Sequence, residues 1–229
     1  MKRKGVFYSE AAYFIGILVL ALGTSMMEQA DWGMSMVVAP AYLIHLKVSQ
    51  VLPWFSFGMS EYVLQAVVLV LLSVVMGGFR KSYLFSFLTA VLYGFTLDLS
   101  ILLVGLVPAA GFSGKLIYYV LGMILCSAGV AMLFRTYIAP EAYELFVKEL
   151  ARKRGWEISR VKTVYDCCSC LLGIVLSFAF FGLWHFEGVK AGTIVCALVN
   201  GWLIGRCDRL LGRMFEFRDG WKLRAVFEK

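Results

Sequence analysis

The feature that most constrains this chain is a series of six stretches that contain no charged side chain. A helix needs about 20 mainly apolar residues to cross a bilayer, and the stretches approach that length. Only 16% of the 229 residues are charged, against about a quarter in a soluble domain. We therefore expect an all-α polytopic membrane protein with six transmembrane helices. The stretches are Ala11–Met27, Tyr62–Phe79, Ser82–Leu97, Leu116–Phe134, Cys167–Trp184 and the shorter Ala191–Gly205.

The basic residues predict how these helices are oriented. Three, two, seven and seven of the 22 lysines and arginines lie in segments 2–4, 80–81, 135–162 and 206–229. With six spans these segments fall on one side of the membrane, and cytoplasmic loops carry the excess of basic residues. We therefore expect both termini, including a tail over 213–229, in the cytoplasm. The net charge of +7 then suits anionic lipid headgroups and requires no nucleic-acid partner.

The N-terminus admits a second interpretation. Basic residues before an apolar run are also typical of a signal peptide. No small-residue cleavage site follows, because the run ends in Met26, Met27 and Glu28. We therefore expect an uncleaved first helix.

A weak internal repeat divides the chain into two halves, about 9–107 and about 115–212. Each half contains a spanning helix, a polar break, a short helix and two more spanning helices. Three spans in each half is an odd number, so the halves would be inserted with opposite orientations, as in many secondary transporters. A chance likeness between two hydrophobic blocks is the alternative. The alignment, with an offset of about 106 to 110 residues, pairs Gly23 with Gly129, Glu61 with Asp166 and Asp98 with Asp208.

Two segments are too short to cross a bilayer. Gly33–Leu46 is apolar on all sides, so we expect it to be buried among other helices or to form a re-entrant loop. Its first amides, near Gly33 and Ser35, could face a cavity. Segment 139–154 has an apolar face and a basic face, which predicts an amphipathic helix at the inner membrane surface.

Polar side chains in or beside the predicted spans are the candidate functional residues. Placing a charged side chain within the membrane costs roughly 2.5–3.5 kcal/mol on insertion scales, so an ionisable residue there is taken first as part of a functional site. We expect Glu61, Asp98 and Asp166 to exchange protons or cations. Alternatively, Glu61 and Asp166 are interfacial carboxylates at helix N-termini, and Asp98 lies at the outer boundary. The expected substrate-binding set is Asp31, Ser35, Glu61, Gln65, Arg135, Glu141, Asp166 and Asn200.

Signatures of enzymes, cofactors and metals are missing from the sequence. Its two histidines, His45 and His185, are far apart, and no HExxH, GxSxG or phosphate-binding loop occurs. The stretch DCCSC at 166–170 makes a soft-metal site conceivable. Helix packing by small polarizable residues explains the cysteines better. We expect no enzymatic activity, no cofactor and no metal, although an unrecognised intramembrane enzyme stays an alternative.

Several motifs resemble the YitT/YczE-like family of bacterial multipass inner-membrane proteins. The resemblance implies the bacterial inner membrane and a multipass topology, whereas the family has no settled molecular activity. The family places Arg and Asp together in each half; here Gln29 replaces the first Arg and Tyr137 the second Asp. A direct pair between Asp31 and Arg135 is disfavoured because inverted halves put them at opposite faces. The matching stretches are QADWGMS at 29–35, RTYIAPEA at 135–142, RVKTVYD at 160–166 and FEGVKAGT at 186–193.

The sequence thus predicts one membrane domain over 1–229 that moves a small solute by alternating access. Proton coupling and a site between the two halves are part of this hypothesis. The alternatives are a membrane partner or assembly subunit that transports nothing, and a substrate-binding subunit of an energy-coupled importer. The expected partners are the lipid bilayer, an unknown small molecule, and either a second copy or another membrane protein.

Overall fold

The computed structural model describes residues 5–156, 158–183, 187, 189–221 and 224. His185, much of the predicted tail and part of the 186–193 motif lie outside these residues. The described chain is mainly helical, as predicted, with one two-stranded sheet. In chain order the elements are β1 (Gly5–Tyr8), α1 (Ser9–Ala30), α2 (Ala39–Val48), α3 (Phe57–Met76), α4 (Lys81–Gly105), α5 (Gly111–Phe134), α6 (Ala142–Arg154), α7 (Ile158–Phe181), α8 (Ala191–Met214) and β2 (Phe215–Arg218).

Within the described residues, five helices rather than the six predicted are long and apolar enough to cross a membrane: α1, α3, α4, α5 and α7. These are the features of an integral membrane protein. Helix α8 has 24 residues, but Arg206, Asp208, Arg209 and Arg213 occupy its C-terminal part. Its composition therefore falls short of a spanning helix.

Helix ends follow from local residue chemistry. The hydroxyl of Ser56 accepts a hydrogen bond from Met59 N, 3.1 Å away, and so caps α3. Gly77 and Gly155 end α3 and α6 in the left-handed conformation that glycine adopts without strain. Pro40 lies in the first turn of α2, where its missing N–H breaks no helical hydrogen bond.

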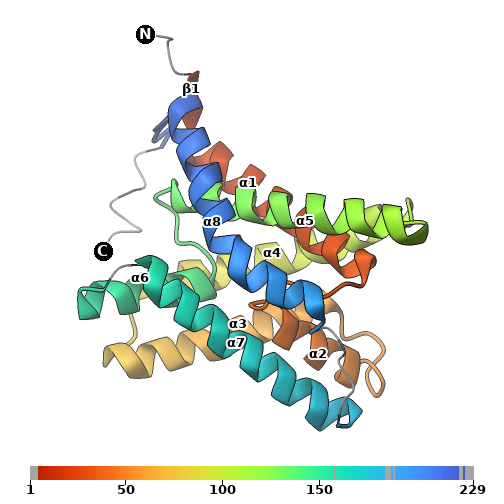
Figure 1. The fold of residues 1–229 in the computed structure, drawn as a ribbon. Coiled ribbons are helices and arrows are strands. Elements are labelled where there is room, and N and C mark those ends of the chain that lie inside the picture. Colours follow the sequence, from red (N-terminus) through yellow and green to blue (C-terminus); the bar gives the residue numbers. More distant parts are fainter. Residues whose placement is uncertain (1–4, 157, 184–186, 188, 222–223, 225–229) are drawn as a thin grey trace.

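The helices repeat the same order in both halves of the chain. Helices α1 to α4 run long, short, long, long, and α5 to α8 do the same. Their contacts also correspond: α1 packs on α4 as α5 packs on α8, and α2 packs on α7 as α6 packs on α3. Figure 1 shows α1 and α5 side by side, and this pair makes the most extensive helix–helix contact.

Four glycines bring α1 and α5 into contact. A Cβ added to Gly16 would lie 3.2 Å from the carbonyl oxygen of Gly129, and one added to Gly23 would lie 2.7 Å from that of Gly122. Since the later residue of α1 meets the earlier residue of α5, the two helices run antiparallel. Small residues at such a crossing let helix backbones approach closely in a membrane.

The first short segment lies inside the protein, as predicted. Met34 and Met36, in the loop before α2, are buried, and so are Ala39, Ala41 and Leu43 of the helix. The loop is anchored at the start of α8, where Gly192 N donates a hydrogen bond to the carbonyl of Trp32, 2.9 Å away.

Helix α6 differs from the interfacial helix predicted for segment 139–154. It packs on α3, α4 and α7 and buries residues around most of its circumference, among them Tyr143, Glu144, Leu145, Val147 and Ala151. Ion pairs make this burial possible, since Glu144 and Glu149 both have cationic partners.

The first and last strands of the described chain pair with each other. Strand β1 pairs in parallel with β2, so the start of α1 lies beside the end of α8 (Figure 1). The buried carboxylate of Glu10 accepts hydrogen bonds from Gly220 N, Trp221 N and the Tyr137 hydroxyl at 3.0, 2.8 and 2.6 Å.

The close approach of α1 and α5 predicts a large effect of one methyl group. Gly23→Ala would place Cβ 2.6 Å from Cys126 N and 2.7 Å from Gly122 O. We expect a loss of about 1–3 kcal/mol in the free energy of unfolding, measured by thermal or denaturant unfolding in detergent. Gly201→Ala on α8 is the control. Nothing lies within 4 Å of its Cβ, so it should be neutral or stabilise by up to about 1 kcal/mol. Equal effects of the two substitutions would contradict the crossing.

Candidate functional site

A buried hydrogen-bond network joins the two halves of the chain. The Gln65 amide nitrogen donates to Glu61 Oε2 and to Glu141 Oε2, both 3.3 Å away, and Gln65 Oε1 accepts from Ala142 N at 3.0 Å. The Tyr143 hydroxyl donates to Glu61 Oε2 at 3.1 Å. Glu61 and Gln65 are one turn apart on α3 and fully buried, while Glu141 and Tyr143 come from the start of α6.

A buried lysine forms a second charged group next to this network. Lys162 Nζ lies 2.9 Å from Glu144 Oε1 and 3.0 Å from Asp166 Oδ1. All three side chains are at least nine-tenths buried. Lys162 and Asp166 are four residues apart on α7 and therefore lie on one helix face.

A small cavity of about 40 Å³ lies between the two halves. One water needs roughly 10–15 Å³ of such volume, so the cavity can hold a few water-sized groups. Its polar lining comes from both halves of the chain. The polar lining residues are Thr24, Ser35, Tyr93, Glu141, Tyr143, Glu144, Lys162 and Asn200.

Two carboxylates on this cavity each have one oxygen without a partner. Glu141 Oε1 and Glu144 Oε2 are buried and accept no hydrogen bond. Burial, together with the nearby carboxylates of Glu61 and Glu144, raises the pKa of Glu141 well above its ordinary value of 4.5. Burial also raises the pKa of Tyr143 well above 10, so its hydroxyl remains a donor.

The structure brings six of the eight predicted binding residues toward the centre. Glu61, Gln65 and Glu141 form the network, Asp166 pairs with Lys162, and Ser35 and Asn200 line the cavity.

The other two binding residues and Asp98 lie elsewhere. Asp31 pairs with Lys190 at 2.6 Å and is largely exposed. The guanidinium group of Arg135 donates two hydrogen bonds to the carboxylate of Asp208, at 2.6 and 2.9 Å. Neither Asp31 nor Arg135 contacts the other, in agreement with the sequence argument against that pair.

Asp98 caps the start of α3. Its carboxylate accepts hydrogen bonds from Gly58 N at 2.8 Å and from the Ser56 hydroxyl at 2.5 Å. A helix N-terminus stabilises an acceptor with a negative charge, and this accounts for the residue without the central site.

Five polar residues of the cavity lining were not predicted from the sequence: Thr24, Tyr93, Tyr143, Glu144 and Lys162. The spacing of Lys162 and Asp166 was a usable signal, because an i, i+4 pair of opposite charge shares a helix face. Tyr93 carried no such signal. It hydrogen-bonds to Thr24 at 2.9 Å, a contact across 69 positions of the sequence.

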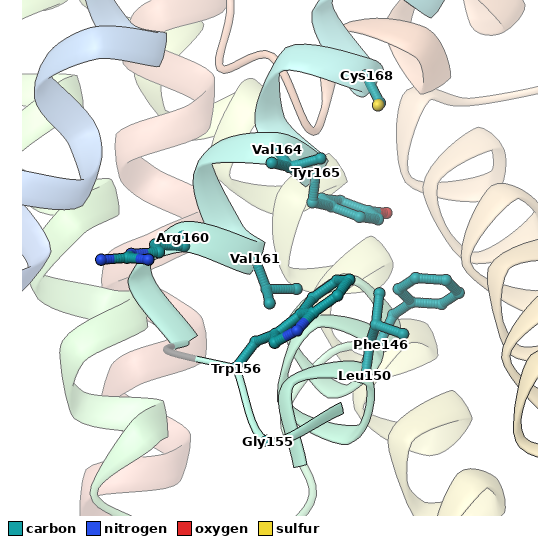
Figure 2. A pocket seen from close by; sticks show the side chains of 9 residues that line it. All are labelled: Phe146, Leu150, Gly155, Trp156, Arg160, Val161, Val164, Tyr165 and Cys168. Atoms are coloured by element: carbon teal, nitrogen blue, oxygen red, sulfur yellow. The ribbon is translucent and has the colours of Figure 1, made fainter. Parts of the chain in front are cut away.

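A larger apolar groove of about 660 Å³ opens between α6 and α7. Figure 2 shows Trp156 beside Val161, with Phe146 and Leu150 opposite on α6 and Cys168 at the far end. Tyr165 contributes to the wall of this groove and packs its ring against Phe146, with centroids 5.7 Å apart. The groove is therefore an apolar surface feature, chemically unlike the central cavity.

The cysteines are spread over several environments. Cys126 and Cys196 are buried, and Cys167 and Cys168 are exposed. In the part of the chain that the structure describes, no three histidine, cysteine or acidic side chains are grouped so as to hold a metal ion.

A family profile covers most of the chain. It matches residues 7–209, from β1 into α8, and its description is a family of unknown function, DUF6198. The chain belongs to the DUF6198 family. No curated protein and no solved structure matches it. Membership in DUF6198 thus assigns a family to most of the helical region, while the resemblance to YitT/YczE-like proteins stays a prediction.

Glu141 predicts a pH-dependent stability. Its folded pKa is raised, so the folded protein keeps a proton that the unfolded chain releases above about pH 4.5. The stability from this group is complete below that pH and is lost as the pH rises toward the folded pKa. We expect the melting temperature to fall from pH 5.5 to 8.0, and to fall less in Glu141→Gln. The exposed control Glu216→Gln should show the same pH dependence of the melting temperature as the wild type. If Glu141→Gln also shows the wild-type pH dependence, the raised pKa does not belong to Glu141.

Lys162 predicts a large loss of stability on substitution. Lys162→Met would leave Glu144 and Asp166 buried without their cation, which costs about 3–5 kcal/mol in comparable pairs. Lys148→Met on the exposed side of α6 should stay within about 0.5 kcal/mol of the wild type. Unfolding of both variants in one detergent measures the difference, and equal stabilities would show that the buried ion pairs are not formed.

Proposed function

We propose that this DUF6198 protein is a six-span secondary transporter of the bacterial inner membrane, with its site between two inverted halves. The pairing of β1 with β2 requires an even number of membrane crossings between them, which supports a sixth span. Five spans would leave β1 and the end of the chain on opposite sides of the membrane, yet β1 pairs with β2. At about 1.5 Å per residue, the 24 residues of α8 are long enough to cross. Its apolar side chains Leu198 and Trp202 are exposed, as they would be to lipid.

Residues separated by the same offset support the inverted repeat. Adding 106 to Gly16 and Gly23 gives Gly122 and Gly129, so the glycine contacts of α1 and α5 exchange under the offset. Two-fold related, antiparallel helices have this property. The same offset relates two tyrosines that bond to the helix at the end of their own half. Tyr13 bonds to Thr89 of α4 at 2.8 Å, and Tyr119 bonds to the Gly192 carbonyl of α8 at 2.5 Å.

The central cavity carries the transport proposal. Inverted-repeat transporters bind their substrate where the halves meet, at non-helical backbone that faces a cavity. Here Ser35 comes from the loop before α2 in the first half, and Glu141 precedes α6 in the second. At about 40 Å³ the cavity represents a closed state, which must open toward each face in turn to pass a solute.

The carboxyl network is the basis for proton coupling. Glu61 and Glu141 share the donor Gln65, and each keeps one buried oxygen without a partner. Such a pair gains stability from a proton that is released when the site opens to water. In this proposal Glu61, Glu141 and Asp166 carry the coupling, and Asp98 serves as a helix cap.

Basic side chains support the proposed orientation. Arg80, before α4, and Arg152, on α6, both bind Glu149 at one end of the helices. Cytoplasmic ends carry such residues, so this end, with α6, faces the cytoplasm in the proposal.

Transport by reconstituted protein tests the proposal. Liposomes with a trapped pH-sensitive dye and an imposed pH gradient receive defined mixtures of amino acids, amines, carboxylic acids or sugars. We expect one mixture to dissipate the gradient through the wild type, and at least tenfold more slowly through Glu61→Gln. Glu216→Gln, exposed on β2, should match the wild type. If no mixture moves protons or solute, the transporter proposal fails.

The groove between α6 and α7 favours a second candidate, a subunit of a larger membrane complex. Its apolar walls would accept a helix of another protein. In that case Val164→Trp, at the groove wall, would abolish the cellular phenotype of the protein while Glu61→Gln would leave it intact. The transporter proposal expects the reverse.

A further inference from the structure

The central cavity has a strong excess of acidic groups. Lys162 is the one basic side chain on its lining, and it is already engaged by Glu144 and Asp166. Glu141 is a second acid on the lining, and Glu61 lies behind it across Gln65, so four acidic side chains surround one base. A site with this balance attracts positive charge and repels anions.

Two oxygen atoms point to a missing hydrogen-bond donor. Glu141 Oε1 and Glu144 Oε2 line the cavity, lack a partner and belong to residues that are 6% and 7% exposed. A buried acceptor without a donor costs about 1–3 kcal/mol, and more when it is charged. A ligand that donates hydrogen bonds to both oxygens would remove this cost.

We propose that the central cavity binds a small ammonium-type cation, either ammonium or a short primary amine, between Glu141 and Glu144 in exchange for a proton. The inference rests on the proposed function and names the substrate class of that same site. In the exchange, the carboxyl of Glu141 releases its proton to water as the cation binds, so one positive charge replaces another.

Hydrogen-bond chemistry favours an ammonium group over a metal ion. A Ca²⁺ ion needs six to eight oxygen ligands in a shell, and among the described residues no three acidic, histidine or cysteine side chains are placed so as to hold a metal ion. An ammonium group instead has several N–H donors that match single acceptors. Thr24 and Asn200 also line the cavity. Asn200 Oδ1 accepts a hydrogen bond from the Ser127 hydroxyl at 3.0 Å and has a second lone pair.

The cavity volume limits the size of the cation. About 40 Å³ accommodates two or three water-sized groups, which fits ammonium or methylammonium. A tetramethylammonium ion is larger and has no N–H donor. It therefore serves as the charge-matched control.

A proton and a cation compete for the carboxyl group of Glu141. The raised pKa of Glu141 means that a cation must displace a proton at neutral pH. Lowering the pH should therefore weaken cation binding. The titratable groups that face Glu141 are Tyr13 of α1, Glu61 of α3, Tyr93 of α4, Cys126 of α5, Tyr143 and Glu144 of α6, and Lys162 and Asp166 of α7.

Equilibrium binding to the purified full chain tests the inference. Intrinsic fluorescence in detergent gives the melting temperature at pH 8.0 and 5.5 with ammonium, methylammonium, sodium, potassium or tetramethylammonium chloride at equal ionic strength. A ligand that binds the folded state raises the melting temperature. We expect ammonium and methylammonium alone to do so at pH 8.0, with half-saturation at least tenfold higher at pH 5.5. Titration calorimetry in two buffers should show about one proton released for each cation bound at pH 6.5 to 7.5.

Variants separate the site from unspecific effects. Glu141→Gln should lose both the cation response and the proton release, Glu144→Gln should weaken binding at least tenfold, and Glu216→Gln should bind as the wild type does. An equal shift with tetramethylammonium, a larger shift with sodium or potassium, or an unchanged response in both folded Glu variants overturns the inference. Binding without any transport in liposomes would refute the proposed function alone. Transport of another solute without ammonium binding would refute this inference alone.

Discussion

The crossing of α1 and α5 is the contact on which the rest of the structure depends. Gly16 and Gly23 face Gly129 and Gly122 at backbone distance, so any larger side chain there would push the two halves apart. In lipid, helices associate through close packing rather than through a hydrophobic effect between them. The antiparallel crossing also fixes where α4 and α8 pack, because each lies against the first helix of its own half. Residues of both halves thereby meet at one cavity.

The charges around that cavity explain why the short segments fold inward. Buried carboxylates and a buried lysine are tolerated only with partners, and the partners come from different helices. Gln65 of α3 accepts a hydrogen bond from Ala142 N and so anchors the start of α6, while Lys162 of α7 forms an ion pair with Glu144. Helix α6 is thus held by polar contacts on two sides, unlike an interfacial helix that buries one apolar face. On the cavity lining, Glu141 Oε1 and Glu144 Oε2 are left without a donor, and they define the chemistry that the cavity can offer a ligand.

Several features were predictable from the sequence because they depend on neighbouring residues. The apolar length of the helices, the burial of the segment that includes Met36, and the order of elements in each half all follow from local composition and spacing. The position of Gln65 one turn from Glu61 also follows from helix periodicity. Ser35 was predictable as a polar residue at the start of a short apolar segment, and Asn200 as a polar residue within an uncharged stretch.

Other features depend on how helices are rotated about their axes, which single-sequence patterns do not specify. Arg135 meets Asp208, and Asp31 meets Lys190, over separations of 73 and 159 residues. Nothing in the sequence selects these partners among other basic and acidic side chains. The uncharged stretch Ala191–Gly205 predicted a sixth span, but the charged end of α8 leaves its composition short of one, and our proposal that it crosses rests on the pairing of β1 with β2.

Access to the centre from each side of the membrane is the most direct test of this account. Ser35→Cys, in a chain whose six native cysteines are replaced by alanine, places a thiol on the cavity between the halves. A small membrane-impermeant thiol reagent is applied to right-side-out and to inside-out vesicles, and the labelled fraction is measured over time. The account predicts that Ser35→Cys is labelled from both sides. Labelling should slow at least severalfold at lower pH, because protonation of Glu61 and Glu141 favours the closed state. Labelling from neither side, at any pH, would mean a solid core between the halves and would contradict it.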